Sequence, residues 1–177
     1  MTKLKITLSG ENKERELKAK SQIERLVKTY NLERYILSSN ITIEYHATPE
    51  AHTNIALNTL WVEDDDMALA SFLHEQMHLI EDLKPREVEK TLRQLSNTYS
   101  NIPIGKSFGA KSPHSNYVHI IINFLEYKAL KEVLGEEKAK EIIEKRANLI
   151  YGWIYKKVIE DYDKLQVLFS KNGILFF

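Results

Sequence analysis

The chain has 177 residues, of which 43% are apolar, and it contains no cysteine. This length is most simply one domain with its own core, and the missing cysteines exclude disulfides, thiol nucleophiles and cysteine-bound zinc. The 25 Lys and Arg residues balance the 25 Asp and Glu residues, so the net charge does not favour nucleic acid or an anionic membrane as a partner. Any bound metal would be held by histidine and carboxylate side chains.

The start of the chain gives no sign of export. Residues 1–10 lack the continuous apolar core of a signal peptide, and no apolar run approaches the length that spans a membrane. As the sequence stands, we expect a soluble, cytoplasmic protein with no membrane partner.

Three segments before residue 63 show the period-two alternation of apolar and polar residues that half-buried strands have. They are residues 3–9, 41–47 and 53–62. Residues 12–35 are charged, with apolar positions at helical spacing, and are expected to form a helix behind these strands. We expect an α+β fold with a small, mostly antiparallel N-terminal sheet. If the third strand is an edge strand, an extended peptide could pair with it.

Residues 74–78 read His-Glu-Gln-Met-His, in a stretch that neither proline nor glycine interrupts. Acidic residues at 64–66 precede it, where carboxylates cap a helix and complement its dipole. On that helix His74 and His78 share one face and can hold one metal ion, with Glu75 about 100° around the helix. Zinc hydrolases use this arrangement, in which the carboxylate takes a proton from zinc-bound water. The plainer interpretation is two histidines on a solvated helix face.

The remainder of the chain is expected to be helical. Helices are predicted from residue 84 onward, over residues 116–134, and along residues 136–168. Residues 97–113 are rich in Asn, Ser, Pro and Gly and are expected to form a loop. The apolar terminus, residues 173–177, is expected to dock into the domain or to make a contact. We therefore expect one domain over residues 1–177, with the strands and the motif helix in 1–83 and a helical part in 84–177.

A third ligand is needed, because a catalytic zinc site has three protein ligands and one open position. The otherwise apolar helix 116–134 carries one polar stripe, which consists of Asn116, His119, Asn123 and Glu126. Glu126 is the strongest candidate, since a buried carboxylate needs a partner and a cation is a good one; the other interpretation is a salt bridge or a rim position. His119 could replace it as a ligand or support the oxyanion of the transition state, with Asn123 orienting a ligand.

With these residues in place, the HExxH motif and a glutamate on a later helix resemble the gluzincin branch of the zincin metallopeptidases, in particular its small, single-domain, minigluzincin-type members. The resemblance covers mainly residues 40–130, and only HExxH is specific. It implies a zincin-like fold, His74, His78 and Glu126 as Zn²⁺ ligands, Glu75 as general base and acid, and a peptide or protein substrate. One departure is Leu130, where thermolysin-like members carry an aspartate.

Two other functions are compatible with the motif. A catalytically inactive zincin-like domain could bind metal or a protein, although an intact Glu75 favours an enzyme. A di-iron carboxylate protein would use Glu75-x-x-His78 as one of two ExxH motifs. No other histidine in the chain has a glutamate three residues before it, which disfavours the di-iron interpretation.

Overall fold

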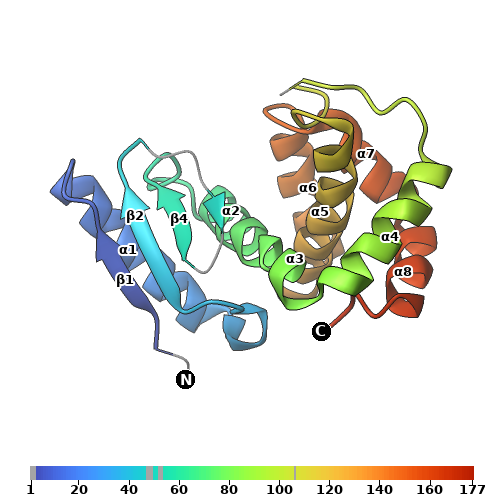
Figure 1. Ribbon diagram of the computed structural model, residues 1–177. Coiled ribbons are helices and arrows are strands. Elements are labelled where there is room, and N and C mark those ends of the chain that lie inside the picture. Colours follow the sequence, from blue (N-terminus) through green and yellow to red (C-terminus); the bar gives the residue numbers. More distant parts are fainter. Residues whose placement is uncertain (1–2, 47–49, 52–53, 106) are drawn as a thin grey trace. The chain divides into compact units, whose positions relative to one another are not determined.

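The computed structural model describes residues 3–46, 50–51, 54–105 and 107–177, and it divides into two compact units (Figure 1). The first unit is Met1–Leu79 with Phe177, and the second is Ile80–Phe176. The first holds the sheet, and the second is built from helices. Among the described residues, no helix is both long enough and apolar enough to cross a membrane.

The first unit alternates strands and helices. Its elements are β1 (Lys5–Leu8), α1 (Lys13–Thr29), the 3₁₀ helix η1 (Leu32–Tyr35), β2 (Asn40–Glu44), β3 (Glu50–Ala51), β4 (Ile55–Asn58) and α2 (Asp65–His78). The strands form one sheet in the order β1-β2-β4-β3. The three predicted strand segments thus each contain a strand, and the predicted helix behind them is confirmed over most of its length.

The predicted mostly antiparallel sheet is wrong. β1 pairs with β2 in parallel, β2 pairs with β4 in parallel, and only the two-residue β3 runs antiparallel to β4. The cause is the connection between strands: α1 carries the chain back along the sheet, so that β2 starts at the same edge as β1. After β2 the chain crosses to the far side of the sheet as β3, and β4 then fills the position between them. Apolar alternation identifies a strand but carries no information on its direction.

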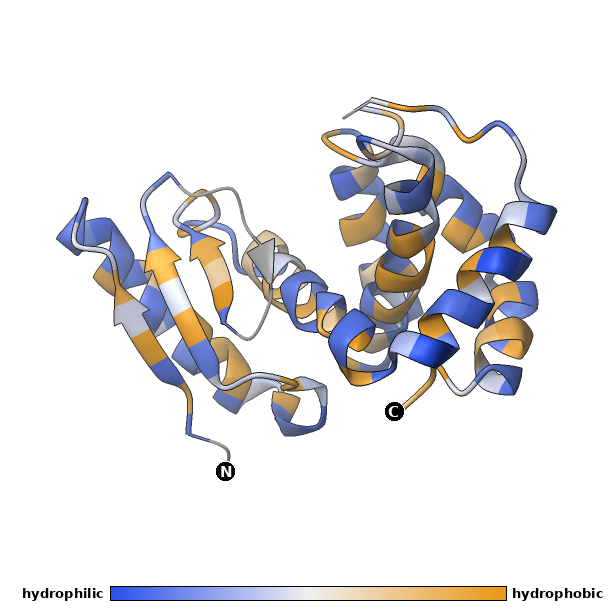
Figure 2. Cartoon of the chain, in the orientation of Figure 1, coloured by the Kyte–Doolittle hydropathy of each residue, from blue (hydrophilic) through white to orange (hydrophobic). Residues whose placement is uncertain are grey.

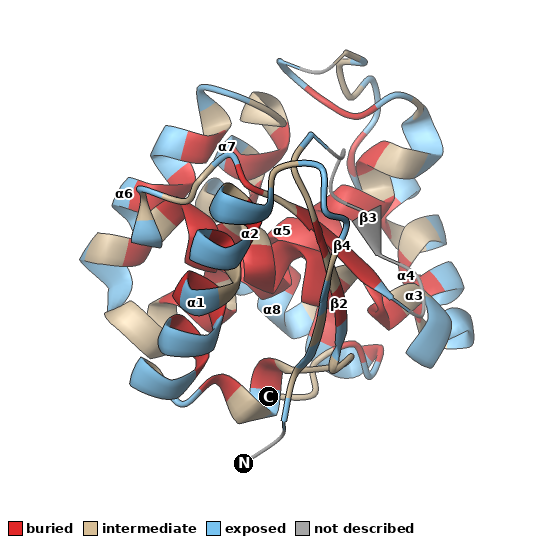
Figure 3. Cartoon of the chain, turned by 90° about the vertical axis from the view of Figure 1, so that its left-hand side faces the viewer, coloured by how far each residue is buried: buried red, intermediate tan, exposed pale blue. Residues whose placement is uncertain are grey.

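The core of the first unit lies between the sheet and the two long helices. α1 packs against β1, β2 and α2, and α2 packs against β4. The strands bury Ile41 and Ile43 of β2 and Ile55 and Leu57 of β4. Figure 2, in the orientation of Figure 1, shows hydrophobic segments in orange along both strands. The outer side of α1 is exposed in Figure 3, as expected for a helix that packs by one stripe.

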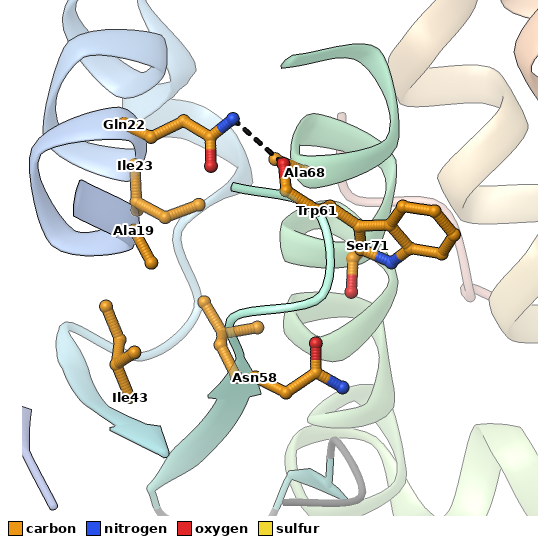
Figure 4. Close-up of a pocket in the computed structure, with 9 residues that line it drawn as sticks. Ala19, Gln22, Ile23, Ile43, Asn58, Trp61, Ala68 and Ser71 are labelled. Carbon is orange, nitrogen blue, oxygen red and sulfur yellow. Dashed lines mark hydrogen bonds between the residues drawn. The ribbon is translucent and has the colours of Figure 1, made fainter. Parts of the chain in front are cut away.

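A small cavity of about 20 Å³ remains between α1, the sheet and α2 (Figure 4). Ala19, Ile23, Ile43 and Ala68 supply apolar parts of its wall. This volume suits about one water molecule. It is therefore a packing defect of the core and too small for a substrate. At its border, Gln22 Nε2 donates a hydrogen bond to the carbonyl oxygen of Trp61 at 3.1 Å.

A buried carboxylate fixes the start of α1. The Glu16 side chain, which is fully buried, accepts hydrogen bonds from the N–H of Gly10 (2.8 Å), the N–H of Asn12 (3.1 Å) and the hydroxyl of Ser9 (2.8 Å). Burial raises the pKa of Glu16, but these hydrogen bonds lower it by more, so the net pKa lies below the ordinary value of 4.5. The ionised carboxylate therefore stabilises the turn between β1 and α1.

The second unit is a helical assembly around one central helix. Its helices are α3 (Ile80–Leu83), α4 (Pro85–Thr98), α5 (Pro113–Leu134), α6 (Glu136–Ala147), α7 (Gly152–Glu160) and α8 (Tyr162–Lys171). α5 packs against α4, α6 and α7, and it buries Ile120, Ile121, Phe124 and Leu125. The helix predicted over residues 116–134 is confirmed, and most of its residues are buried.

The amphipathic segment predicted over residues 136–168 consists of three helices. α6 ends at Ala147, and Tyr151 has a left-handed backbone with φ 57°, which cannot continue a helix. A second break falls at Asp161, between α7 and α8. The apolar spacing continues through both breaks, because all three helices turn their apolar sides to the same core. Periodicity alone therefore did not reveal the breaks.

The apolar C-terminal segment packs against the rest of the chain, as one of the expectations for it had it. Asn172 Nδ2 donates to Thr91 Oγ1 (3.1 Å) and Gln94 Oε1 (2.6 Å), and Ile174 is fully buried in the second unit. Phe177, which belongs to the first unit, places its ring edge-on against Tyr35 with 4.8 Å between centroids.

The Glu16 carboxylate should make folding stability depend on pH. A group whose pKa is lower in the folded state contributes its full stability above its unfolded pKa and loses it as the pH falls through the folded pKa. We expect Glu16→Gln to lower the melting temperature at neutral pH and to have a shrinking effect below pH 4.5. Thermal unfolding over this pH range measures it, with Glu14→Gln on the exposed side of α1 as control. Equal losses for both variants at every pH would contradict the prediction.

Candidate functional site

The HExxH motif lies on the helix that the sequence predicts. Asp64 is the N-cap residue of α2, and its Oδ1 accepts a hydrogen bond from the N–H of Met67 at 3.1 Å. α2 ends at His78. The motif therefore occupies the last turn and a half of the helix, and His78 is its final residue.

The two histidines share one face of α2, as predicted from their spacing. The His74 and His78 ring centroids are 5.0 Å apart, at an interplanar angle of 72°. His74 is buried and His78 is half-buried, while the Glu75 side chain beside them is also buried, with 5% exposed. The arrangement offers two imidazoles to one ion and a carboxylate next to them, and these are ligand types that zinc accepts.

The third residue of the motif, Gln76, has a structural role that the sequence did not indicate. Its Oε1 accepts hydrogen bonds from the N–H of Leu37 (2.8 Å) and of Ser38 (3.0 Å), and its Nε2 donates to the carbonyl oxygen of Ser38 (3.0 Å). Gln76 is fully buried. These bonds attach the motif end of α2 to the segment just before β2, which holds the neighbouring His74 and Glu75 in place.

The opposite end of α2 is attached to α1. Arg25 binds both carboxylate oxygens of Asp65, at 2.7 and 2.8 Å, and Gln22 Nε2 donates to the same carboxylate at 3.0 Å. The hydrogen bonds from Arg25, and then those from Gln22, lower the pKa of Asp65. Asp65 was expected only to complement the helix dipole; it also connects two helices.

In the second unit, the polar stripe of α5 is buried, as predicted, but Glu126 already has protein partners. Its Oε1 lies 2.9 Å from Arg146 Nε, and its Oε2 accepts a hydrogen bond from the Tyr155 hydroxyl at 2.8 Å. Arg146 Nε also donates to the Tyr155 hydroxyl at 2.8 Å. Burial raises the pKa of Tyr155 well above its ordinary value, so the hydroxyl stays a donor. The salt bridge that was the other interpretation of Glu126 is present.

His119, one turn before Asn123 on α5, has a fixed ring. Its Nδ1 lies 2.7 Å from the carbonyl oxygen of Ser115. A carbonyl oxygen only accepts hydrogen bonds, so Nδ1 carries the proton and the lone pair of the neutral ring lies on Nε2. The ring also packs against Tyr151, with 4.3 Å between centroids. Metal-binding histidines are commonly oriented in this way, by donating their other N–H to a carbonyl.

The two asparagines of the stripe differ from each other. Asn116 holds the loop before α5, because its Oδ1 accepts from the N–H of Ala110 (2.5 Å) and its Nδ2 donates to the carbonyl oxygen of Pro103 (3.2 Å). Asn123 is fully buried, and its amide makes no hydrogen bond with any residue that the structure describes. Such a group is costly to bury without a partner.

From the sequence, Tyr117, Tyr127 and His114 are further candidates for oxyanion support, and His46, His52 and His114 are further candidates for the third ligand. The Tyr117 hydroxyl donates to the carbonyl oxygen of Tyr99 at 2.9 Å, and His114 is exposed at the start of α5. Tyr127 packs edge-on against Tyr162 in the second unit. His52 lies outside the described residues. Sequence reasoning missed Gln76, Arg146 and Tyr155, because their partners are distant along the chain and no local pattern marks them.

Gln76 should contribute to stability independently of any metal. Gln76→Leu removes the acceptor of two backbone N–H groups and is expected to cost about 1–3 kcal/mol of unfolding free energy. Urea unfolding, with and without a chelator, measures this change. Gln166→Leu, at an exposed position of α8, is the control and should change stability by less than about 0.5 kcal/mol. Equal effects of the two variants would show that the Gln76 hydrogen bonds are unimportant.

The Glu126–Arg146 pair should behave as a coupled unit. Glu126→Leu or Arg146→Met alone leaves one buried charge without its partner and is expected to cost about 3–5 kcal/mol. The double variant should be less destabilised than the sum of the two, since it removes both charges. Denaturant unfolding of the four proteins gives the coupling energy. Additive losses would mean that the two side chains do not interact in solution.

Comparisons with protein-family models, curated proteins and solved structures find no match for this chain. The resemblance to gluzincins is therefore carried by the HExxH motif itself. What the site can do follows from the chemistry of the side chains described above.

Proposed function

We propose that the chain is a zinc-dependent metallopeptidase that hydrolyses peptide bonds. The observation that carries the proposal is the HExxH motif in helical form, with His74 and His78 on one face and the buried Glu75 carboxylate beside them. The lack of cysteine agrees with a site made of imidazole and carboxylate groups.

For the third ligand, we favour His119 over Glu126. The Glu126 carboxylate is bound by Arg146 and Tyr155, and a metal ligand in that position would have to give up a buried ion pair. The His119 ring is instead oriented by the Ser115 carbonyl, with its lone pair on Nε2. His74, His78 and His119 would supply three imidazole ligands, and a set of three histidines is a known ligand set of catalytic zinc.

In this proposal the protein side chains have separate tasks. Zinc, when bound, acts as a Lewis acid on water and on the scissile carbonyl. Glu75 takes a proton from the attacking water and later delivers it to the leaving amine, which is the work of a positioned general base. Gln76 holds the motif end of α2 through the backbone of Leu37 and Ser38, so the carboxylate keeps its orientation.

Glu126 has a different task in this assignment. Together with Arg146 and Tyr155, it connects α5 to α6 and α7, and so it fixes the helix that carries His119. In this proposal Glu126 affects zinc binding indirectly, because it fixes the position of α5. If His119 binds zinc through Nε2, it does not also support the oxyanion, which was the alternative role for His119, because one nitrogen cannot do both.

The general base can be separated from the ligands. Glu75→Gln should keep the zinc content of the wild type and lose about 10²- to 10⁴-fold in the rate of peptide hydrolysis, because it removes only the proton acceptor. Metal analysis and turnover of a diverse peptide mixture, run on the same preparations, measure both quantities. Zinc in the wild type without turnover of any peptide would favour an inactive zincin-like binding domain instead.

The ligand assignment makes opposite predictions for two residues of α5. His119→Ala should lose most of its zinc after dialysis against a weak chelator, whereas Glu126→Gln should retain it, since the amide oxygen can still accept the Tyr155 hydrogen bond. Zinc content and melting temperature are measured for both variants. Loss of zinc from Glu126→Gln with retention in His119→Ala would make Glu126 the ligand. Full zinc with a reduced rate in His119→Ala would assign His119 to oxyanion support.

A further inference from the structure

An open pocket of about 350 Å³ lies in the first unit, where the parallel strands β2 and β4 end. It is lined by Arg15, Tyr45, His46, Asn58, Thr59 and Leu60. Arg15 comes from the first turn of α1, and the others follow β2 or end β4. In α/β sheets, ligands commonly bind beyond the carboxyl ends of parallel strands.

Arg15 is held in this pocket, and no described carboxylate forms an ion pair with it. Its Nη2 donates to the carbonyl oxygen of Thr59 at 3.0 Å, and its guanidinium lies 5.9 Å from the centre of the Tyr45 ring. Its Nε is buried and has no hydrogen-bond acceptor, and no carboxylate pairs with it among the residues that the structure describes. A guanidinium has five N–H donors, and the only hydrogen bond that this one makes to described residues is to Thr59.

The surroundings of Arg15 favour an anion. Among the residues that the structure describes, none that lines the pocket carries a carboxylate. His46, whose ring lies 3.8 Å from that of Tyr45 between centroids, adds a second nitrogen donor. The nearest buried acid along α1, Glu16, is turned to Ser9, Gly10 and Asn12. The positive end of the α1 dipole lies at the same turn as Arg15.

The pocket is separate from the HExxH residues. Gln76 binds the backbone of Leu37 and Ser38, which precede β2, whereas Tyr45 and His46 follow it. The two places therefore lie at opposite ends of β2. Five residues of an extended strand span about 16 Å. A ligand in this pocket therefore does not have to contact the HExxH residues.

We propose that this pocket binds a phosphate group, with Arg15 as its principal cation and His46 as a second donor. Arg15 and His46 reach the pocket from different elements, α1 and the end of β2. A tetrahedral phosphate has oxygens for donors that come from separate directions, whereas the two oxygens of a carboxylate are satisfied by one guanidinium fork. The ligand class is therefore a small phosphorylated molecule, and the site is independent of the proposed peptidase function.

The experiment is a titration of the whole chain with inorganic phosphate at constant ionic strength, followed by the NMR shifts of backbone amides. We expect saturable shifts confined to the neighbourhood of Arg15, Tyr45, His46 and Asn58–Leu60. Arg15→Gln should weaken binding by about tenfold or more, as expected when a charge-assisted hydrogen bond is lost. Arg93→Gln, an exposed arginine that pairs with Glu89, is the matched control and should bind phosphate like the wild type.

A second pocket variant and a second anion complete the experiment. His46→Gln leaves the bond between Arg15 and Thr59 in place and should still weaken phosphate binding, so it replaces Arg15→Gln if that variant does not fold. Acetate should bind at least about tenfold more weakly than phosphate; equal binding would make the pocket a carboxylate site and overturn the ligand class. Absence of saturable shifts, or equal affinities of the wild type and both pocket variants, would overturn the site.

Discussion

The geometry of the candidate site depends on how α2 is held at its two ends. Asp65 is bound by Arg25 and Gln22 at the start of the helix, and Gln76 is bound to the backbone of residues 37 and 38 near its end. Between these points the helix cannot rotate without breaking the hydrogen bonds of the buried Gln76 side chain, which is costly. The fixed rotation of α2 determines the direction in which His74 faces. Gln76, inside the HExxH motif, therefore has a structural role.

The second unit solves a different electrostatic problem. Placing Glu126 in an apolar core requires a compensating charge, and the fold supplies one from α6 through Arg146, with Tyr155 bridging the two. With this ion pair in place, a metal bound by the Glu126 carboxylate would have to displace Arg146 or Tyr155 from it. The polar stripe of α5 then divides into parts with separate roles: Asn116 holds a loop, Glu126 joins helices, and His119 keeps an oriented imidazole.

The direction of the strands has consequences beyond the sheet itself. Because β1, β2 and β4 run in parallel, their carboxyl ends lie at the same end of the sheet, and α1 begins there, directly after β1. This topology brings Arg15 next to Thr59, which is 44 residues away along the chain. In an antiparallel sheet, strand starts and strand ends would alternate along this end of the sheet. The residues after β2 and at the end of β4 would then not lie together around Arg15.

The sequence by itself determined the local features: the strand segments, the helix that carries HExxH, its acidic N-cap, and the shared face of His74 and His78. These follow from period, capping and spacing, which act over a few residues. The tertiary structure decided the parallel sheet, the breaks at Tyr151 and Asp161, the anchoring of Gln76 and the partner of Glu126. Each of these depends on contacts between residues far apart in the chain, and such contacts leave no mark in the local pattern. The sequence can indicate that a buried charge needs a partner, but the identity of that partner depends on the packed fold.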